Sequence, residues 1–154
     1  MQADRLHTES VQILTAVFLP KAGPAGIGVA AAGMPATTIS SVYEQAFGSA
    51  EYLHFRAILR ALQLGRELRA ERISVLCPDE EIVKLINRET PMESGSGLVP
   101  LYMRIRALMH TYRLAEVRAV PRSKVAPAQR LAAAASRMPA RKKDLQRDLF
   151  TAAA

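Results

Sequence analysis

The first third of the chain combines apolar, β-branched runs with turn residues, a pattern typical of antiparallel strands. Residues 11–19 form one apolar run, and a segment rich in Pro and Gly, residues 20–26, separates it from a second run at residues 27–32. These runs predict a β-hairpin. Residues 37–42 predict a third strand, which residues 43–47 can extend.

Helical spacing replaces this pattern from Ala50 to Leu68, where apolar residues recur every three or four positions. Ser49 is a suitable N-cap for such a helix. A short strand is predicted at residues 72–76 and a short helix at residues 79–87. The order to this point is therefore three strands, a helix, a strand and a helix.

The C-terminal part continues with alternating elements after a flexible Ser/Gly loop at residues 93–97. The predicted order is a helix, a strand, a loop and an Ala-rich helix, at residues 98–112, 115–120, 121–127 and 128–138. We expect a short N-terminal extension at residues 1–10, one domain at residues 11–138 and a basic, flexible tail at residues 139–154.

Composition supports one domain with an aliphatic core. The chain has 154 residues, of which 49% are apolar but only 5% aromatic, so Leu, Ile, Val and Ala must fill the core. No apolar run approaches the roughly 20 residues that span a bilayer, and Met1 to Glu9 does not look like a signal peptide. A single cysteine, Cys77, excludes an internal disulfide and fits a cytoplasmic protein.

Positive charge is concentrated in the C-terminal third. Residues 1–100 hold 9 Lys/Arg and 11 Asp/Glu, whereas residues 101–154 hold 12 and 3, within a total charge of +7. A one-sided basic surface is typical of proteins that bind polyanions. An Arg-rich face that contacts only solvent explains the same charge, and both interpretations stay open.

Local motifs resemble those of bacterial type 1 ribonuclease H-like proteins, over about residues 11–137. The similar segments, in chain order, are Gly23 to Gly28, Ala50 to Leu53, Asp79 to Val83, Val120 to Arg122 and Ala128 to Ala132. The resemblance implies an α/β fold of the ribonuclease H type. Its five-stranded mixed sheet has three antiparallel strands followed by two parallel strands, with helices flanking the sheet.

Members of this family hydrolyse the RNA strand of RNA/DNA hybrids with two Mg²⁺ or Mn²⁺ ions roughly 4 Å apart. Four carboxylates hold these ions, from the first strand, the first helix, the end of the fourth strand and the last helix. The resemblance assigns Glu51 and Asp79 to the second and third positions. Leu19 or a neighbour occupies the first position and Gln129 the fourth, so only a weak metal site at Glu51 and Asp79 is expected.

Two gaps in the distribution of acidic residues support this loss. No Asp or Glu lies between Glu9 and Glu44, nor between Glu116 and Asp144. Glu44, Glu80 and Glu81 are the nearest acids that could rescue the site. The simpler interpretation of Glu51 and Asp79 is that they are, respectively, an exposed acid at a helix start and a helix N-cap.

His54 lies one turn after Glu51 and could approach the same pocket, although a surface or half-buried role is the simpler interpretation. Cys77 is expected to be a buried thiol at a strand end rather than a nucleophile, because the sequence places no base beside it.

Two further groups indicate binding. Phosphate contacts are predicted for the basic residues around the last strand and helix, which are Arg118, Arg122, Lys124 and Arg130. The tail segment from Gln146 through Asp148 and Leu149 to Phe150 resembles the peptide by which bacterial replication and repair proteins bind the sliding clamp. Its alternative is a short amphipathic helix that docks on the domain.

The sequence therefore predicts a nucleic-acid-associated ribonuclease H-like protein, acting in replication, repair or hybrid metabolism, with impaired catalysis and no cofactor. The main alternative is an active endoribonuclease that uses Mg²⁺ or Mn²⁺ in a rearranged site. The other alternative is a protein-interaction or dimerisation module that does not bind nucleic acid.

Overall fold

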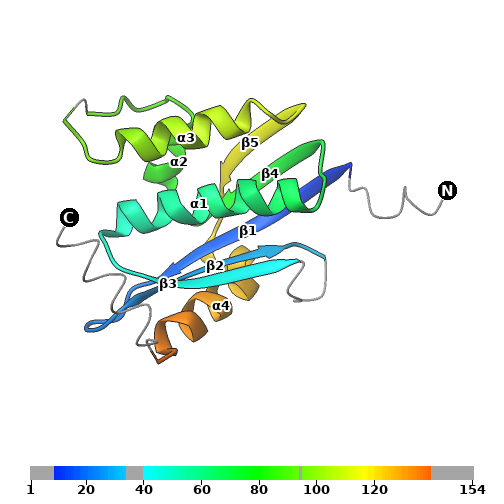
Figure 1. The fold of residues 1–154 in the computed structure, drawn as a ribbon. Helices are drawn as coiled ribbons and strands as arrows, with labels where there is room; N and C mark the ends of the chain where they lie inside the picture. The colour runs from blue at the N-terminus through cyan, green and yellow to red at the C-terminus, as the bar shows by residue number, and fades with distance from the viewer. Residues whose placement is uncertain (1–8, 34–39, 94, 140–154) are drawn as a thin grey trace.

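A five-stranded mixed sheet runs through the part of the chain that the structure, a computed structural model, describes: residues 9–33, 40–93 and 95–139 (Figure 1). The strand order is β3-β2-β1-β4-β5. β1 pairs antiparallel with β2 and parallel with β4; β2 and β3 are antiparallel, and β4 and β5 are parallel. The strands are β1 Ser10–Phe18, β2 Ala25–Ala31, β3 Ser41–Ala46, β4 Arg72–Cys77 and β5 Leu114–Ala119.

Helices cover both faces of this sheet. The helices are α1 Ala50–Glu67, α2 Glu80–Ile86, α3 Val99–Met109 and α4 Ala126–Arg137, with a 3-10 turn, η2 Arg122–Val125, before α4. In Figure 1, α1, α2 and α3 lie on one side of the sheet and α4 on the other. None of the helices in these residue ranges is long and apolar enough to cross a membrane.

The predicted α/β class and the mixed five-stranded sheet are confirmed. Several boundaries differ from the prediction: β2 begins at Ala25 rather than at residue 27, and α3 ends at Met109 rather than at residue 112. The third strand begins at Ser41 rather than at residue 37, and residues 37–39 lie outside the described residues. The predicted loop at residues 121–127 contains η2, and α4 starts at Ala126, because Pro127 is accepted in the first turn of a helix.

The side chains of β1 alternate between the two faces of the sheet. Ile13 and Val17 belong to the core cluster beneath α1, whereas Leu14 and Ala16 belong to the cluster beneath α4. Successive side chains of a strand point to opposite faces. Thr15, which is fully buried, therefore faces the α1 side.

Two glycines allow α4 to lie directly on β2. A Cβ atom at Gly26 would stand 1.7 Å from the Ala132 carbonyl oxygen, and one at Gly28 would stand 2.0 Å from that of Ala128. Both distances are impossible for real side chains, so the backbones meet here only because glycine occupies both positions. The Gly-rich segment thus fixes the position of α4, which carries Gln129.

The far end of α4 is held by polar contacts. The amide of Gln45 on β3 donates to the carbonyl oxygens of Ala135 and Met138, at 3.2 and 2.7 Å. The Ser136 hydroxyl donates to the Pro24 carbonyl oxygen at 2.8 Å. The two Gln45 bonds satisfy carbonyl groups at the end of α4, and the Ser136 bond ties this end of the helix to the segment before β2.

Candidate active-site remnant and basic surface

Asp79 stands at the end of β4 and caps the next helix. Its Oδ1 accepts a hydrogen bond from the Ile82 backbone N–H at 3.1 Å, which makes it the N-cap of α2. The simpler interpretation of this residue as an N-cap is therefore confirmed. Its other oxygen, Oδ2, stays available and lies 3.8 Å from Nε2 of His54.

His54 links Asp79 to Cys77. The imidazole reaches inward from α1 with 12% of its side chain exposed, and its Nδ1 lies 4.0 Å from the Cys77 Sγ. Burial lowers the pKa of His54; Asp79 opposes this effect and Arg122 adds to it. The half-buried role considered for His54 is observed, and so is its approach to the pocket of Asp79.

Cys77 is fully buried beside these groups, and burial raises its pKa to about 11. The thiol therefore stays protonated at neutral pH and is a poor nucleophile. The sequence places no base beside Cys77, but the fold does, because His54 approaches from another element, 23 residues earlier. The conclusion that Cys77 is a buried thiol at a strand end is correct.

Thr15, on β1, completes a cluster that also contains His54, Cys77 and Asp79. Sequence reasoning missed Thr15. Its hydroxyl donates to the Leu76 carbonyl oxygen at 2.9 Å and also hydrogen-bonds Cys77. The parallel register of β1 and β4 pairs Leu14 with Leu76, so Thr15 lies level with Cys77. The sequence does mark this position, because Thr15 is the only polar residue between Ile13 and Leu19 in an otherwise apolar segment.

The four positions assigned from the resemblance lie in different surroundings. Leu19 follows the last residue of β1 and is 50% exposed, whereas Thr15 is the β1 residue level with the end of β4. Glu51 is exposed in the first turn of α1, three residues before His54. Gln129 on α4 donates to the Val17 carbonyl oxygen at 3.4 Å. Asp79 is the one acid among these residues that contacts the cluster.

The three acids considered as replacements are engaged elsewhere. Glu44 accepts from the Arg56 guanidinium at 2.7 Å. Glu80 and Glu81 lie 3.7 and 3.8 Å from the Lys84 ammonium, and their side chains are 72% and 78% exposed. None of these contacts brings a second carboxylate to Asp79.

The four predicted phosphate contacts are all exposed, and they lie on β5, η2 and α4. Arg122 is close enough to His54 to lower its pKa. Arg118 lies 4.0 Å from Glu116 on the edge strand β5. Lys124 is on the same turn as Arg122, and Arg130 is on the exposed side of α4.

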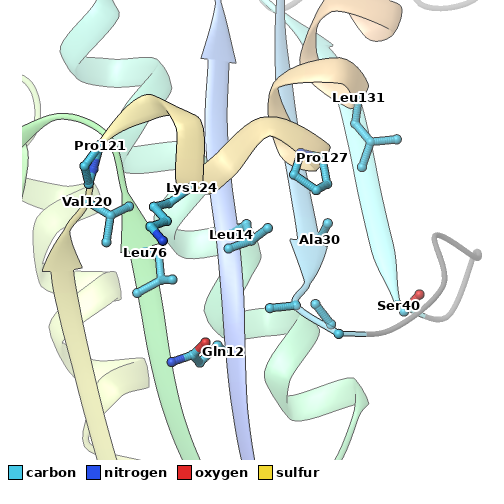
Figure 2. Close-up of a pocket in the computed structure, with 13 residues that line it drawn as sticks. Gln12, Leu14, Ala30, Ser40, Leu76, Val120, Pro121, Lys124, Pro127 and Leu131 are labelled. Carbon is cyan, nitrogen blue, oxygen red and sulfur yellow. The ribbon is translucent and has the colours of Figure 1, made fainter.

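Lys124 also borders an apolar pocket on the α4 face of the sheet (Figure 2). The pocket holds about 380 Å³ and is lined by Leu14, Leu76, Pro127 and Leu131 among others. Because Leu14 and Thr15 point to opposite faces of β1, this pocket is separate from the cluster around Asp79.

A family model described as reverse transcriptase-like matches residues 16–135. The chain belongs to the reverse transcriptase-like family. No curated protein matches the sequence significantly. Family membership and the sheet order agree with the resemblance to ribonuclease H-like proteins.

Solved structures similar to this reverse transcriptase-like chain share its whole fold. The N-terminal ribonuclease H domain of a Mycobacterium tuberculosis protein superposes with a TM-score of 0.71 at 24% identity, covering 84% of this chain and 94% of that one. Ribonuclease H1 from Halobacterium salinarum superposes with a TM-score of 0.72 at 16% identity, covering 82% of this chain and 96% of that one. LC11-RNase H1, solved with an RNA/DNA hybrid, superposes with a TM-score of 0.69 at 21% identity and covers the same shares of the two chains, 82% and 96%. At these identities the likeness establishes the ribonuclease H-like fold.

The side chains of this reverse transcriptase-like domain do not fit the two divalent metals that ribonuclease H-like proteins typically use. Mg²⁺ and Mn²⁺ need several oxygen ligands, and the cluster offers one carboxylate, at Asp79. The two nitrogens of His54 face different partners, so its imidazole cannot join Cys77 and Asp79 around one ion. Within the described residues, no three His, Cys, Asp or Glu side chains could hold a metal.

Proposed function

We propose that this chain is a nucleic-acid-binding ribonuclease H-like domain that holds the sugar-phosphate backbone and does not hydrolyse it. One observation carries the proposal: at the end of β4 the chain gathers Thr15, His54, Cys77 and a single carboxylate, Asp79. Arg122 is close enough to this cluster to lower the pKa of His54. A site with a single carboxylate, next to the basic turn η2, favours the binding of a phosphate group over the binding of a metal ion.

The proposed ligand is a nucleic acid whose backbone phosphates contact the basic residues of η2 and α4. RNA/DNA hybrid is the first candidate, because LC11-RNase H1 was solved with such a hybrid. Phosphate contacts from Arg122, Lys124 and Arg130 need no divalent ion, so binding is expected to persist in EDTA. Each phosphate contact contributes a slope of about 0.9 to the dependence of log affinity on log salt concentration for duplex DNA.

Fluorescence anisotropy with labelled hybrid, duplex DNA and single-stranded RNA, in EDTA at several salt concentrations, tests this function. The Arg122→Gln/Lys124→Gln variant should bind more weakly, with a salt slope lower by about 2. Arg69→Gln/Arg72→Gln, which removes two exposed charges away from this surface, is the matched control. Binding that is absent, or equally weakened by both variants, contradicts the proposal.

An active ribonuclease H with a rearranged site is the alternative function. It is favoured by the position of Glu51, which lies one turn before His54 on α1 and is exposed. Mn²⁺-dependent cleavage of hybrid that is abolished by Glu51→Gln and Asp79→Asn would establish it. If the chain shows no salt-dependent binding of nucleic acid, it is instead a protein-interaction or dimerisation module.

The sliding-clamp proposal rests on the sequence of residues 146–150 alone, since this segment lies outside the described residues. Leu149 and Phe150 are expected to enter an apolar pocket of the clamp, with Gln146 and Asp148 at its edge. Surface plasmon resonance with a purified bacterial clamp should detect binding that Leu149→Ala/Phe150→Ala removes. Equal binding by this variant, or no binding by the native chain, means that the motif is a coincidence.

A further inference from the structure

A second basic feature lies in the groove between α1 and α3, away from the cluster at Asp79. The groove holds about 470 Å³, and three guanidinium groups line it: Arg56 and Arg60 from α1, and Arg104 from α3. No acidic residue is among its lining residues. A concave surface whose lining contains arginines and no carboxylate attracts anions.

The charges of these arginines are only partly compensated. Arg56 donates to Glu44 at 2.7 Å and to the Tyr52 hydroxyl at 3.2 Å. Arg60 is half-buried and donates to the neutral side-chain amide of Gln63. Within the described part of the chain, no salt bridge involves Arg60 or Arg104. Arg60 and Arg104 therefore have no charged partner among the described residues.

The start of α3 adds to this positive potential. Gly97, Pro100 and Leu101, at the beginning of this 11-residue helix, also line the groove. The helix has no acidic residue in its first turn and no side-chain cap hydrogen bond. Ser96 accepts from the Leu98 and Val99 N–H groups through its hydroxyl and its carbonyl oxygen, at 3.2 and 3.3 Å, and Pro100 has no N–H. The Leu101 N–H and the positive end of the helix dipole therefore remain to favour an anion near the arginines.

Helical geometry separates this groove from the cluster at Asp79. At 100° per residue, Arg56 and Arg60 lie roughly 160° and 120° away from His54 around α1. His54 points to Asp79 and Cys77 under the helix, so the arginines face the opposite side. A ligand in the groove cannot touch the cluster directly.

We propose that the groove between α1 and α3 is a second anion site that binds a phosphate group through Arg60, Arg104 and the start of α3. Guanidinium groups bind phosphate through paired, charge-assisted hydrogen bonds. The phosphate belongs either to a small phosphorylated molecule or to the backbone of a nucleic acid. The proposal does not depend on the binding surface at Arg122.

NMR of the ¹⁵N-labelled full chain, titrated with pyrophosphate, tests the site. The arginine Nε–H signals of Arg60 and Arg104 and the amide signals of Gly97 and Leu101 should shift together. Arg60→Gln/Arg104→Gln should weaken pyrophosphate binding by about tenfold or more, and the control Arg69→Gln/Arg72→Gln by less than about twofold. Absence of these shifts, or equal weakening by both variants, overturns the proposal.

Two further arms identify the source and keep this proposal distinct from the proposed function. A single-stranded oligonucleotide that displaces pyrophosphate from the groove signals indicates a nucleic-acid backbone, and failure to displace it indicates a small phosphorylated ligand. Arg122→Gln/Lys124→Gln should leave pyrophosphate affinity unchanged even if the native chain binds no hybrid. Loss of the groove shifts in this variant would contradict a separate site.

Discussion

The contact between β2 and α4 gives a sharp prediction, because a single methyl group at Gly28 must push the two backbones apart. In Gly28→Ala the new Cβ would stand 2.0 Å from the Ala128 carbonyl oxygen and 2.7 Å from the Ala132 nitrogen. To restore an ordinary contact of 3.4 Å, α4 must move by about 1.4 Å, the difference between 3.4 and 2.0 Å. Backbone atoms cannot rotate away as a side chain can.

The expected loss of stability follows from two opposing terms. Overpacking a tight contact costs about 3 kcal/mol when only backbone can yield. Replacing Gly by Ala also restricts the unfolded chain, which returns about 0.5 to 1 kcal/mol. The net loss is therefore about 2 kcal/mol, which for a chain of this size lowers Tm by about 6 °C.

Urea unfolding followed by circular dichroism measures this loss, with Gly95→Ala as the matched control. Nothing lies within 4 Å of a Cβ built at Gly95, so this substitution should be neutral or slightly stabilising. If Gly28→Ala and Gly95→Ala have the same free energy of unfolding, the close approach of α4 to β2 is not real. The placement of Gln129 and of the basic turn before α4 would then also be in doubt.

Two further predictions concern the cluster at Asp79. Because the pKa of Cys77 is raised from 9.0 to about 11, its contribution to stability is fully present below pH 9 and is lost as the pH rises through 11. Unfolding free energy should fall by about 2 to 3 kcal/mol across this range, and the fall should be smaller in Cys77→Ala; identical pH profiles would refute the burial of the thiol. Thr15→Asp/His54→Glu should bring three carboxylates together with Asp79, so millimolar Mn²⁺ should raise the Tm of this variant and not that of the native chain. Equal Mn²⁺ responses would show that these positions do not converge.

The fold was largely predictable because its signals are local. Periodicity identified α1 from its buried stripe and Ser49 as its N-cap, and the Ser49 hydroxyl accepts from the Tyr52 N–H at 3.2 Å. The third strand was misplaced because β-branched residues alone do not fix register, whereas pairing with β2 places Ser41 opposite Ala30. Local composition does not encode such long-range pairing.

The site was less predictable because its residues meet only through tertiary packing. The family resemblance assigned Asp79 to the site, and its role as an N-cap was predictable because a strand end followed by an N-cap is a local feature. Thr15 and Cys77 become neighbours through the parallel pairing of β1 with β4, and His54 joins them from α1. Matching motifs to a family directed attention to Glu51, although the side chain that contacts Asp79 belongs to His54, one turn later.

We propose that this domain, which has a ribonuclease H-like fold, binds nucleic acid without hydrolysing it. Labelled RNA/DNA hybrid, incubated with an equimolar amount of the full chain and Mn²⁺ and analysed on a denaturing gel, tests this claim most directly, with binding followed in parallel by anisotropy. The expected result is a bound, intact RNA strand over many hours. Cleavage that requires Mn²⁺ and disappears in Asp79→Asn would contradict the account.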